Sequence, residues 1–304
     1  MRRLLKRILP TSLLEEIREV RRLPSLSDNI ARDVFNVSDV TQKSLVAMWT
    51  LARQQGTRLA FNQVGFKAFS QFEEDGILLY LFTIIGASSR VVVEVCAGSG
   101  RECMATNLIL HHGWTGFLWD GNKDNVRRGR QFFAEHPASF LHPPSFRCDW
   151  LTRENINSVL ASSGLNGDID LLSLDVDGND LWLWDAIIQV KPRVVIVESQ
   201  NAIPSNRSLT IPYDPSFYAW NRKPEEVYFF GASALALVKI GKQKGYRLVG
   251  AHRHGFNLVF LRNDVDAEWF PEVSVESVHD SPYTRWSQET RWPALEKMPW
   301  QEVT

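Results

Sequence analysis

The carboxylates best placed to do chemistry follow two short apolar runs. Asp175 and Asp177 come directly after the run 170–174, and Glu198 follows the run 194–197. If the two runs are neighbouring parallel strands, their carboxyl ends meet at one edge of a sheet, where open α/β folds bind ligands. Carboxylates crowded at such an edge can act as a general base or hold a divalent cation.

Two catalytic schemes fit these residues. In one, Asp177 or Glu198 is the general base for a hydroxyl, with a pKa raised by like charge. In the other, Asp177, Glu198 and Asn201 bind Mg²⁺, which lowers the pKa of the hydroxyl. A structural alternative is that 177–180 is only a turn and a helix cap. His252, in the loop between the last two expected strands, is a further candidate base, although a solvated loop histidine is the commoner role for such a residue.

A second group of residues has the pattern of a nucleoside site. The β-branched run 91–95 ends in the small-residue turn 96–100, and a helical stretch follows over 102–112. The next apolar run, 116–119, delivers Asp120 at its end. Small residues let a backbone approach a ligand closely, and an acid after the second strand is placed to accept hydrogen bonds from ribose hydroxyls.

The charge pattern favours a cationic nucleoside over a dinucleotide. The turn lacks the third glycine of a dinucleotide motif, and Glu102 in the first helical turn would repel a pyrophosphate. S-adenosylmethionine suits this pattern better than NAD. Gly98 and Gly100 could alternatively serve only to form a tight turn. We predict that Asp120 binds the ribose and Asp149 the adenine edge. The full set of expected cofactor contacts is Glu94, Gly98, Gly100, Asp120, Asp149 and Asp175.

The elements that must position these residues alternate between strand and helix. Such alternation predicts a doubly wound, mostly parallel α/β sheet, and the short link between the last two strands predicts an antiparallel hairpin. The expected strands are 91–95, 116–119, 145–148, 170–174, 194–197, 246–250 and 257–261. The expected helices are 71–85, 102–112, 124–136, 152–162, 181–188 and 232–244.

Several motifs in this layout resemble those of FkbM-type methyltransferases and their uncharacterised relatives. They are FSQFEEDGI (69–77), EVCAGSG (94–100), GWTGFLWDG (113–121), LLSLDVDGND (171–180), FGAS (230–233) and GYRLVG (245–250). The resemblance covers about 69–262. It implies a Rossmann-like class I methyltransferase fold that uses S-adenosylmethionine. Cys96 departs from the pattern, because such proteins usually carry glycine there, and its side chain narrows the space beneath the ligand.

These observations predict a cytoplasmic methyltransferase that acts on an oxygen of a saccharide or another polar, small-molecule or glycan acceptor. The long insertion 200–230 is rich in aromatic and polar residues, which suit stacking on a sugar ring and bonding its hydroxyls. The insertion could equally be a lid that packs on Trp182 and Trp184. The alternative function is a non-catalytic, ligand-binding or scaffold member of this fold, recruited to a membrane-associated assembly.

The composition excludes several other classes. With 44% hydrophobic and 23% charged residues, the 304-residue chain is typical of soluble globular proteins. A net charge of −1 gives no general attraction to nucleic acid. The three cysteines have no metal-ligand spacing, which indicates a reducing compartment. No signal peptide or membrane-spanning run is visible. We expect a helical extension over 1–65, a methyltransferase domain over 66–265 and a tail over 266–304.

The first 23 residues interleave arginine and lysine with paired leucines. Such a segment could lie as a helix on an anionic membrane surface. It could equally pack on the main domain or on a partner chain. The oligomeric state stays open.

Overall fold

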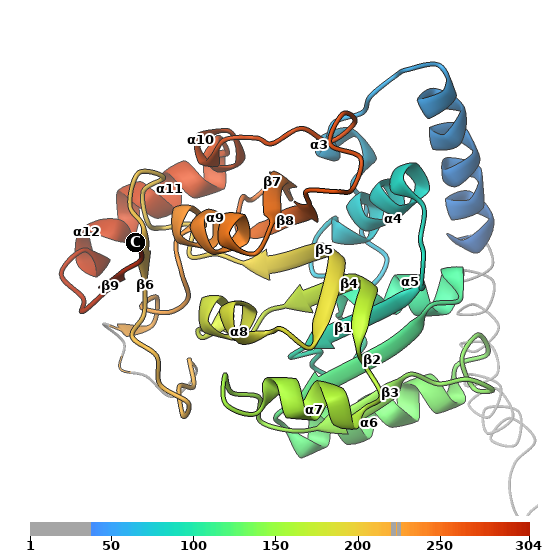
Figure 1. Ribbon diagram of the computed structural model, residues 1–304, viewed down its shortest axis with the longest axis horizontal. Helices are drawn as coiled ribbons and strands as arrows, with labels where there is room; N and C mark the ends of the chain where they lie inside the picture. Colours follow the sequence, from blue (N-terminus) through green and yellow to red (C-terminus); the bar gives the residue numbers. More distant parts are fainter. Residues whose placement is uncertain (1–37, 220–222, 224–225) are drawn as a thin grey trace, which may run out of the picture. The chain divides into compact units, whose positions relative to one another are not determined.

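The computed structural model describes residues 38–219, 223 and 226–304 (Figure 1). The chain divides into two compact units, Met1–Gln55 and Gly56–Thr304. The described part of the first unit is a helix over 38–54. The basic segment 1–23 lies outside the described residues, so its membrane contact stays a prediction, as do the domain bounds at 65 and 265. No helix of the described residues has the length and apolarity that crossing a bilayer requires.

The second unit is built on a seven-stranded sheet of order β3-β2-β1-β4-β5-β8-β7. Neighbouring strands from β3 to β5 run parallel, while β8 runs antiparallel to both β5 and β7. The fold prediction is therefore confirmed: a doubly wound, mostly parallel sheet closed by an antiparallel hairpin, which is the class I methyltransferase layout. The strands are β1 (Val91–Val95), β2 (Thr115–Asp120), β3 (Ser145–Cys148), β4 (Gly167–Leu174), β5 (Val190–Glu198), β7 (Tyr246–Ala251) and β8 (Asn257–Arg262).

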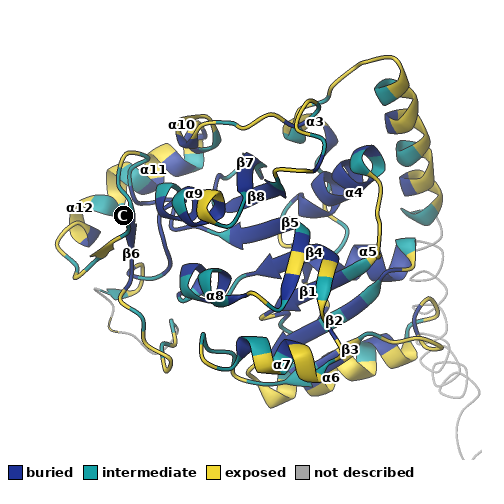
Figure 2. Cartoon of the chain, in the orientation of Figure 1, coloured by how far each residue is buried: buried dark blue, intermediate teal, exposed yellow. Residues whose placement is uncertain are grey.

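Helices cover both faces of this sheet. In one layer α4 packs on α5, which contacts β1 and β2; in the other, α8 contacts both α7 and α9 (Figure 1). Two helical layers bury the central strands on both faces, as their β-branched composition requires (Figure 2). The helices are α3 (Phe61–Val64), α4 (Glu74–Ile85), α5 (Met104–His112), α6 (Lys123–Glu135), α7 (Ile156–Ser162), α8 (Asp180–Ala186), α9 (Ala234–Gln243), α10 (Val275–His279), α11 (Pro282–Thr290) and α12 (Trp292–Leu295).

Side-chain hydrogen bonds explain where some helices begin later than the sequence predicts. The Glu94 carboxylate accepts the backbone N–H groups of Met104 and Ala105, so α5 begins at Met104 rather than at 102. Helix α4 begins at Glu74 rather than at 71. The preceding residues instead form a loop held by Asp75, which accepts the N–H groups of 68–70 at 2.6–2.7 Å. Burial raises the pKa of Asp75 to about 6.

The same loop ties the start of α4 to the far edge of the sheet. Glu73 accepts hydrogen bonds from the backbone N–H and the Nε of Arg253, at 2.6 and 2.8 Å. Glu74 accepts one from Asn257 Nδ2 at 2.8 Å. The three acids of the FSQFEEDGI motif therefore fix the loop that carries Gln71 and Phe72.

The insertion and the C-terminal segment pack together. Strand β6 (Leu209–Thr210) of the insertion pairs with β9 (Gln301–Glu302) near the C-terminus. Thr284 on α11 donates to the carbonyl of His254 at 2.9 Å, in the loop between β7 and β8. The C-terminal segment thus lies against the edge of the sheet at which β5 ends.

Candidate functional site

Three predicted acids meet at the carboxyl edge of β4 and β5. Leu174 pairs with Val197 across the two strands, so the next residues, Asp175 and Glu198, lie side by side. Carboxylate oxygens of Asp175, Asp177 and Glu198 lie within 4.8 Å of one another. The sequence therefore identified the members of this cluster and the edge at which they gather.

The cluster keeps a proton or requires a cation. Asp175 and Glu198 share a hydrogen bond; burial raises the pKa of both well above the usual range, and the surrounding carboxylates raise it further. A carboxylate pair so close cannot ionise fully unless a positive charge is present. The all-oxygen donor set matches the ligands preferred by hard divalent cations.

Two aspartates of the turn after β4 have different roles, one in closing the turn and one at the cavities. Asp180 accepts the N–H groups of Val176 and Gly178 at 2.8 and 2.9 Å, and burial raises its pKa to about 6. Asp180 therefore closes the turn, as the cap alternative expects. Asp177 instead has a φ of +52°, a left-handed conformation that non-glycine residues adopt at a cost of about 1 kcal/mol. The turn thereby directs Asp177 into the cavities described next.

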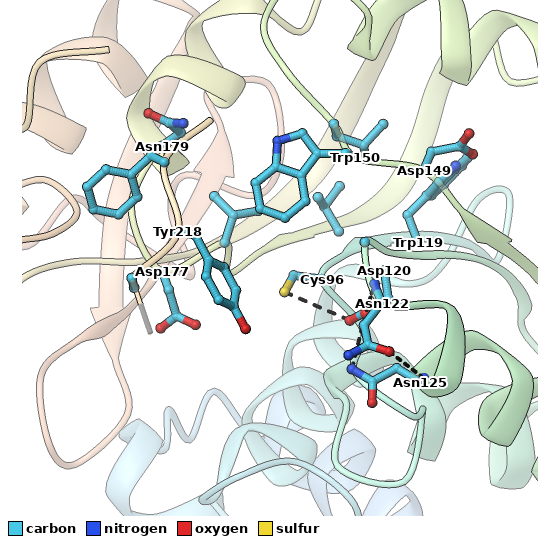
Figure 3. Close-up of a pocket in the computed structure, with 16 residues that line it drawn as sticks. Cys96, Trp119, Asp120, Asn122, Asn125, Asp149, Trp150, Asp177, Asn179 and Tyr218 are labelled. Carbon is cyan, nitrogen blue, oxygen red and sulfur yellow. Dashed lines mark hydrogen bonds between the residues drawn. The ribbon is translucent and has the colours of Figure 1, made fainter. Parts of the chain in front are cut away.

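A cavity of about 420 Å³ lies over the carboxyl ends of β1, β2 and β4; we call it the nucleoside cavity. Figure 3 shows Asp177 and Tyr218 on one side and Asp120, Asn122 and Asn125 on the other, with Cys96 between them. Asp149 also lines the cavity. The described residues that line it include three aspartates and no lysine, arginine or histidine. Its electrostatics therefore favour a cationic ligand.

Asp120 is held in place by the loops around it. Its Oδ2 accepts the N–H of Gly98 at 2.9 Å, and its Oδ1 accepts the N–H of Asn122 and the Nδ2 of Asn125 at 2.8 and 3.1 Å. Oδ1 therefore already has two donors, whereas Oδ2 has one N–H donor and the weak Cys96 thiol at 4.0 Å, so Oδ2 is the oxygen that can accept a hydrogen bond from a ligand. The predicted ribose acid is thus fixed at the cavity wall before any ligand arrives.

An aromatic wall completes the nucleoside cavity. Trp150 donates its indole N–H to the carbonyl of Pro215 at 2.8 Å, and its ring lies 6.3 Å from that of Tyr218 (Figure 3). The sequence prediction missed Trp150. Its position directly after Asp149, at the end of the third strand, is the signal that could have identified it. A flat ring at this edge suits stacking on a nucleobase.

A second cavity, of about 410 Å³, adjoins the first; we call it the acceptor cavity. Asp177 and Ala219 line both. Glu198 lines only the acceptor cavity, while the insertion and the C-terminal segment supply much of its wall. The acid cluster therefore lies where the two cavities meet. The other lining residues are Gln71, Phe72, Ser199, Gln200, Asn201, Val227, Tyr228, Phe230, His254, Phe256, Tyr283 and Arg291.

Four predicted cofactor residues do not line the nucleoside cavity. Glu94 is buried and engaged at the start of α5, as described above, and burial raises its pKa. Gly98 donates to Asp120 and so acts through it. At Gly100, a Cβ would lie 2.7 Å from the Phe133 ring, so packing explains this glycine, as the tight-turn alternative expects. Asp175 touches the site only through the acid cluster.

Two other candidates are placed differently from the expectation. His252 is buried, with 3% of its surface exposed, so the expectation of a solvated loop histidine is wrong. It lines neither cavity, and burial lowers its pKa to about 3. Asn201 lines the acceptor cavity, but its amide oxygen accepts a hydrogen bond from Ser287 at 3.3 Å. The structure therefore offers His254, rather than His252, as the histidine at the acceptor cavity.

Cys96 occupies a position that favours glycine. Its φ is +68°, a left-handed conformation in which glycine is less strained than cysteine. Its sulfur lies 4.0 Å from Asp120 Oδ2 and lines the nucleoside cavity. Although Cys96 is exposed to the cavity, desolvation by the surrounding protein raises the pKa of its thiol, and the charges of Asp175 and Asp120 raise it further.

Comparisons with known proteins find only distant similarities. No family model and no curated protein matches the chain. The N-terminal domain of EvdMO1, solved with SAH bound, is 14% identical, with 65% of this chain and 90% of that one covered and a TM-score of 0.42. An S-adenosylmethionine-dependent methyltransferase from Clostridium acetobutylicum is 10% identical, with 67% and 91% covered and a TM-score of 0.38. An O-methyltransferase family protein from Burkholderia thailandensis is 13% identical, with 62% and 58% covered and a TM-score of 0.36. At these values the fold assignment rests on the strand order of the chain itself.

Proposed function

We propose that this protein is an S-adenosylmethionine-dependent methyltransferase of the FkbM type that methylates an oxygen of a saccharide or another polar metabolite. One observation carries the proposal: Asp177 lines both an anionic cavity next to Asp120 and a polar, aromatic cavity. Methyl transfer needs such an arrangement, because donor and acceptor must approach in line from two sides.

The nucleoside cavity fits the cofactor. Asp120 would bind the ribose hydroxyls, Asp149 would bind the adenine edge, and the Trp150 ring would lie against the base. The cofactor supplies a methyl group on a positively charged sulfur, which the three aspartates of this cavity attract.

The acid cluster would prepare the acceptor. The acceptor oxygen forms a bond to the methyl carbon as the carbon–sulfur bond breaks, and the hydroxyl proton passes to a carboxylate. Asp177 is the carboxylate placed for this transfer, since it lines both cavities. The proton shared by Asp175 and Glu198 would keep their charge from repelling the oxygen as it becomes anionic.

A divalent cation at the same cluster is the second form of this proposal. Asp175, Asp177 and Glu198 would be its ligands, and Asn201 would contribute the second lone pair of an amide oxygen that accepts a hydrogen bond from Ser287. Dialysis against a chelator decides between the two forms. Activity lost on dialysis and restored by Mg²⁺ or Mn²⁺ supports the cation, whereas unchanged activity supports the proton-sharing pair.

Calorimetry with S-adenosylmethionine, followed by methyl transfer from the labelled cofactor to a panel of sugars, tests the proposed function. We expect binding with a dissociation constant in the micromolar range and label on at least one polar acceptor. Binding without turnover on any acceptor would favour a non-catalytic, ligand-binding role. Absence of binding would contradict the cofactor assignment.

A further inference from the structure

Arg291 is the one arginine or lysine among the described residues that line the acceptor cavity. It follows the last residue of α11, and its guanidinium lies over three aromatic rings. The distances from Cζ to the ring centroids are 4.0 Å for Tyr228, 4.7 Å for Trp286 and 5.7 Å for Tyr283. Stacking of this kind fixes the plane of the guanidinium and removes water from its faces.

The guanidinium has only neutral hydrogen-bond partners. One nitrogen, Nη1, donates to the hydroxyls of Tyr283 and Ser287, at 3.2 and 3.5 Å. The Nε is buried and has no partner among the described residues. Within the part of the chain that the structure describes, no carboxylate lies within ion-pair distance of Arg291. Arg291 is partly exposed, but its buried Nε and its stacked faces are removed from water, so pairing with an anion would be favourable.

The rest of the cavity wall suits the body of an acceptor. Gln71, Gln200 and His254 offer neutral polar groups, and Phe72 and Phe256 offer aromatic surface. Asp177 and Glu198 also line this cavity, at the side where it adjoins the nucleoside cavity. Arg291 therefore adds a positive charge to a wall that holds acids and neutral groups.

We propose that Arg291 binds an oxyanion carried by the acceptor, a carboxylate or a phosphate, and so restricts the substrate to anionic polar metabolites. The planar fork of donors matches both groups. The proposal rests on the proposed function only in assigning this cavity to the acceptor. Arg291 lies in the segment after 265, outside the FkbM-type resemblance, so the preference would be a property of this chain.

Binding of three sugar probes to the full chain in the presence of S-adenosylhomocysteine tests the proposal. Glucuronate carries a carboxylate, glucose 1-phosphate carries a phosphate, and glucose carries neither. We expect at least one anionic probe to bind about tenfold more tightly than glucose. Whichever of glucuronate and glucose 1-phosphate binds more tightly shows whether Arg291 prefers a carboxylate or a phosphate. Equal affinities for all three probes, or no binding of either anion at tens of millimolar, would overturn the proposal, whether or not any variant folds.

Variants of two arginines locate the preference. Arg291→Gln should abolish it, and Arg291→Lys should restore part of it, since lysine keeps the charge and loses the fork. Arg285→Gln is the matched control, because Arg285 belongs to the same helix but pairs with Asp280 and lines neither cavity. An unchanged preference in a folded Arg291→Gln protein would overturn the proposal. Binding of S-adenosylhomocysteine itself is measured separately by calorimetry. If S-adenosylhomocysteine does not bind while the preference for anionic sugars persists, the proposed function fails and the assignment of Arg291 stands.

Discussion

The two cavities have nearly the same volume, 420 and 410 Å³, and different chemical characters. The described residues that line the nucleoside cavity carry three carboxylates and no basic group, whereas those of the acceptor cavity carry Arg291 and His254 as well as Asp177 and Glu198. A cationic cofactor and an anionic acceptor would each meet the complementary charge. The comparison shows that one sheet edge can be divided by a single turn, 175–180, into two regions of different potential.

The two cavities also differ in which parts of the chain build them. The nucleoside cavity is built chiefly by the loops that follow β1 to β4, with Phe217 to Ala219 of the insertion as its cover. The acceptor cavity takes its wall from the start of α4, the insertion and the C-terminal segment. The loops at the strand ends thus form most of the nucleoside side, and segments outside the sheet form most of the acceptor side.

The largest expected effect is at the residue that both cavities share. Asp177→Asn keeps size and one oxygen but removes the charge, so turnover should fall roughly 10²-fold or more under either catalytic scheme. Cofactor affinity should change little. Steady-state methyl transfer and calorimetry measure the two quantities.

Asp168→Asn is the matched control for this variant, because Asp168 lies at the opposite end of β4 and pairs with Arg262. Its turnover should match that of the parent. Full activity in Asp177→Asn, together with indifference to chelator, would assign the turn a purely structural role and direct attention to Glu198.

A second effect should be confined to the nucleoside cavity. Asp120→Ala should weaken the binding of S-adenosylmethionine by roughly 2 kcal/mol, since the ribose hydroxyls lose their charged acceptor. Asp124→Ala, on the exposed surface of α6, should leave affinity unchanged. Titration calorimetry of both variants decides the matter; equal affinities would place the ribose elsewhere.

A third effect separates packing from ligand contact in the turn 96–100. Gly100→Ala places a Cβ 2.7 Å from the Phe133 ring at a φ of +70°, so we expect it to lower the free energy of unfolding by about 2 kcal/mol. At Gly98 nothing lies within 4 Å of the added Cβ and the φ is +55°, so Gly98→Ala should cost about 1 kcal/mol. Urea denaturation ranks the two, and the reverse order would contradict the packing argument.

The last effect concerns pH dependence and lies behind the acceptor cavity, at His252. Its pKa is lowered to about 3 in the folded protein, so the unfolded chain binds more protons between pH 3 and 6.5. Stability from this group is therefore present above pH 6.5 and is lost as the pH falls below it. The parent should lose about 1.4 kcal/mol of its free energy of unfolding through this group when the pH falls from 7.5 to 5.5. His252→Gln should lack this part of the loss. Parallel urea titrations at the two pH values test this, and identical pH dependence in parent and variant would count against it.

The fold could be predicted because strand and helix signals agree with one another along the chain. The strand over 91–95 and the meeting of the acids after β4 and β5 could be predicted because the carboxyl ends of parallel strands lie at one edge of a sheet. Helix starts were less predictable, since Glu94 and Asp75 set them through contacts made by folding. Tyr283 and Arg291 reach the site from a distant segment, so no local pattern indicated them, whereas the position of Trp150 after the third strand could have done so.

A crystal structure with S-adenosylhomocysteine is the most direct test of the division between the two cavities. Our account predicts the ribose on Asp120 and the base beside Trp150, with the acceptor cavity left open on the other side of Asp177. A nucleoside bound in the acceptor cavity, against Tyr228 and Arg291, would contradict it.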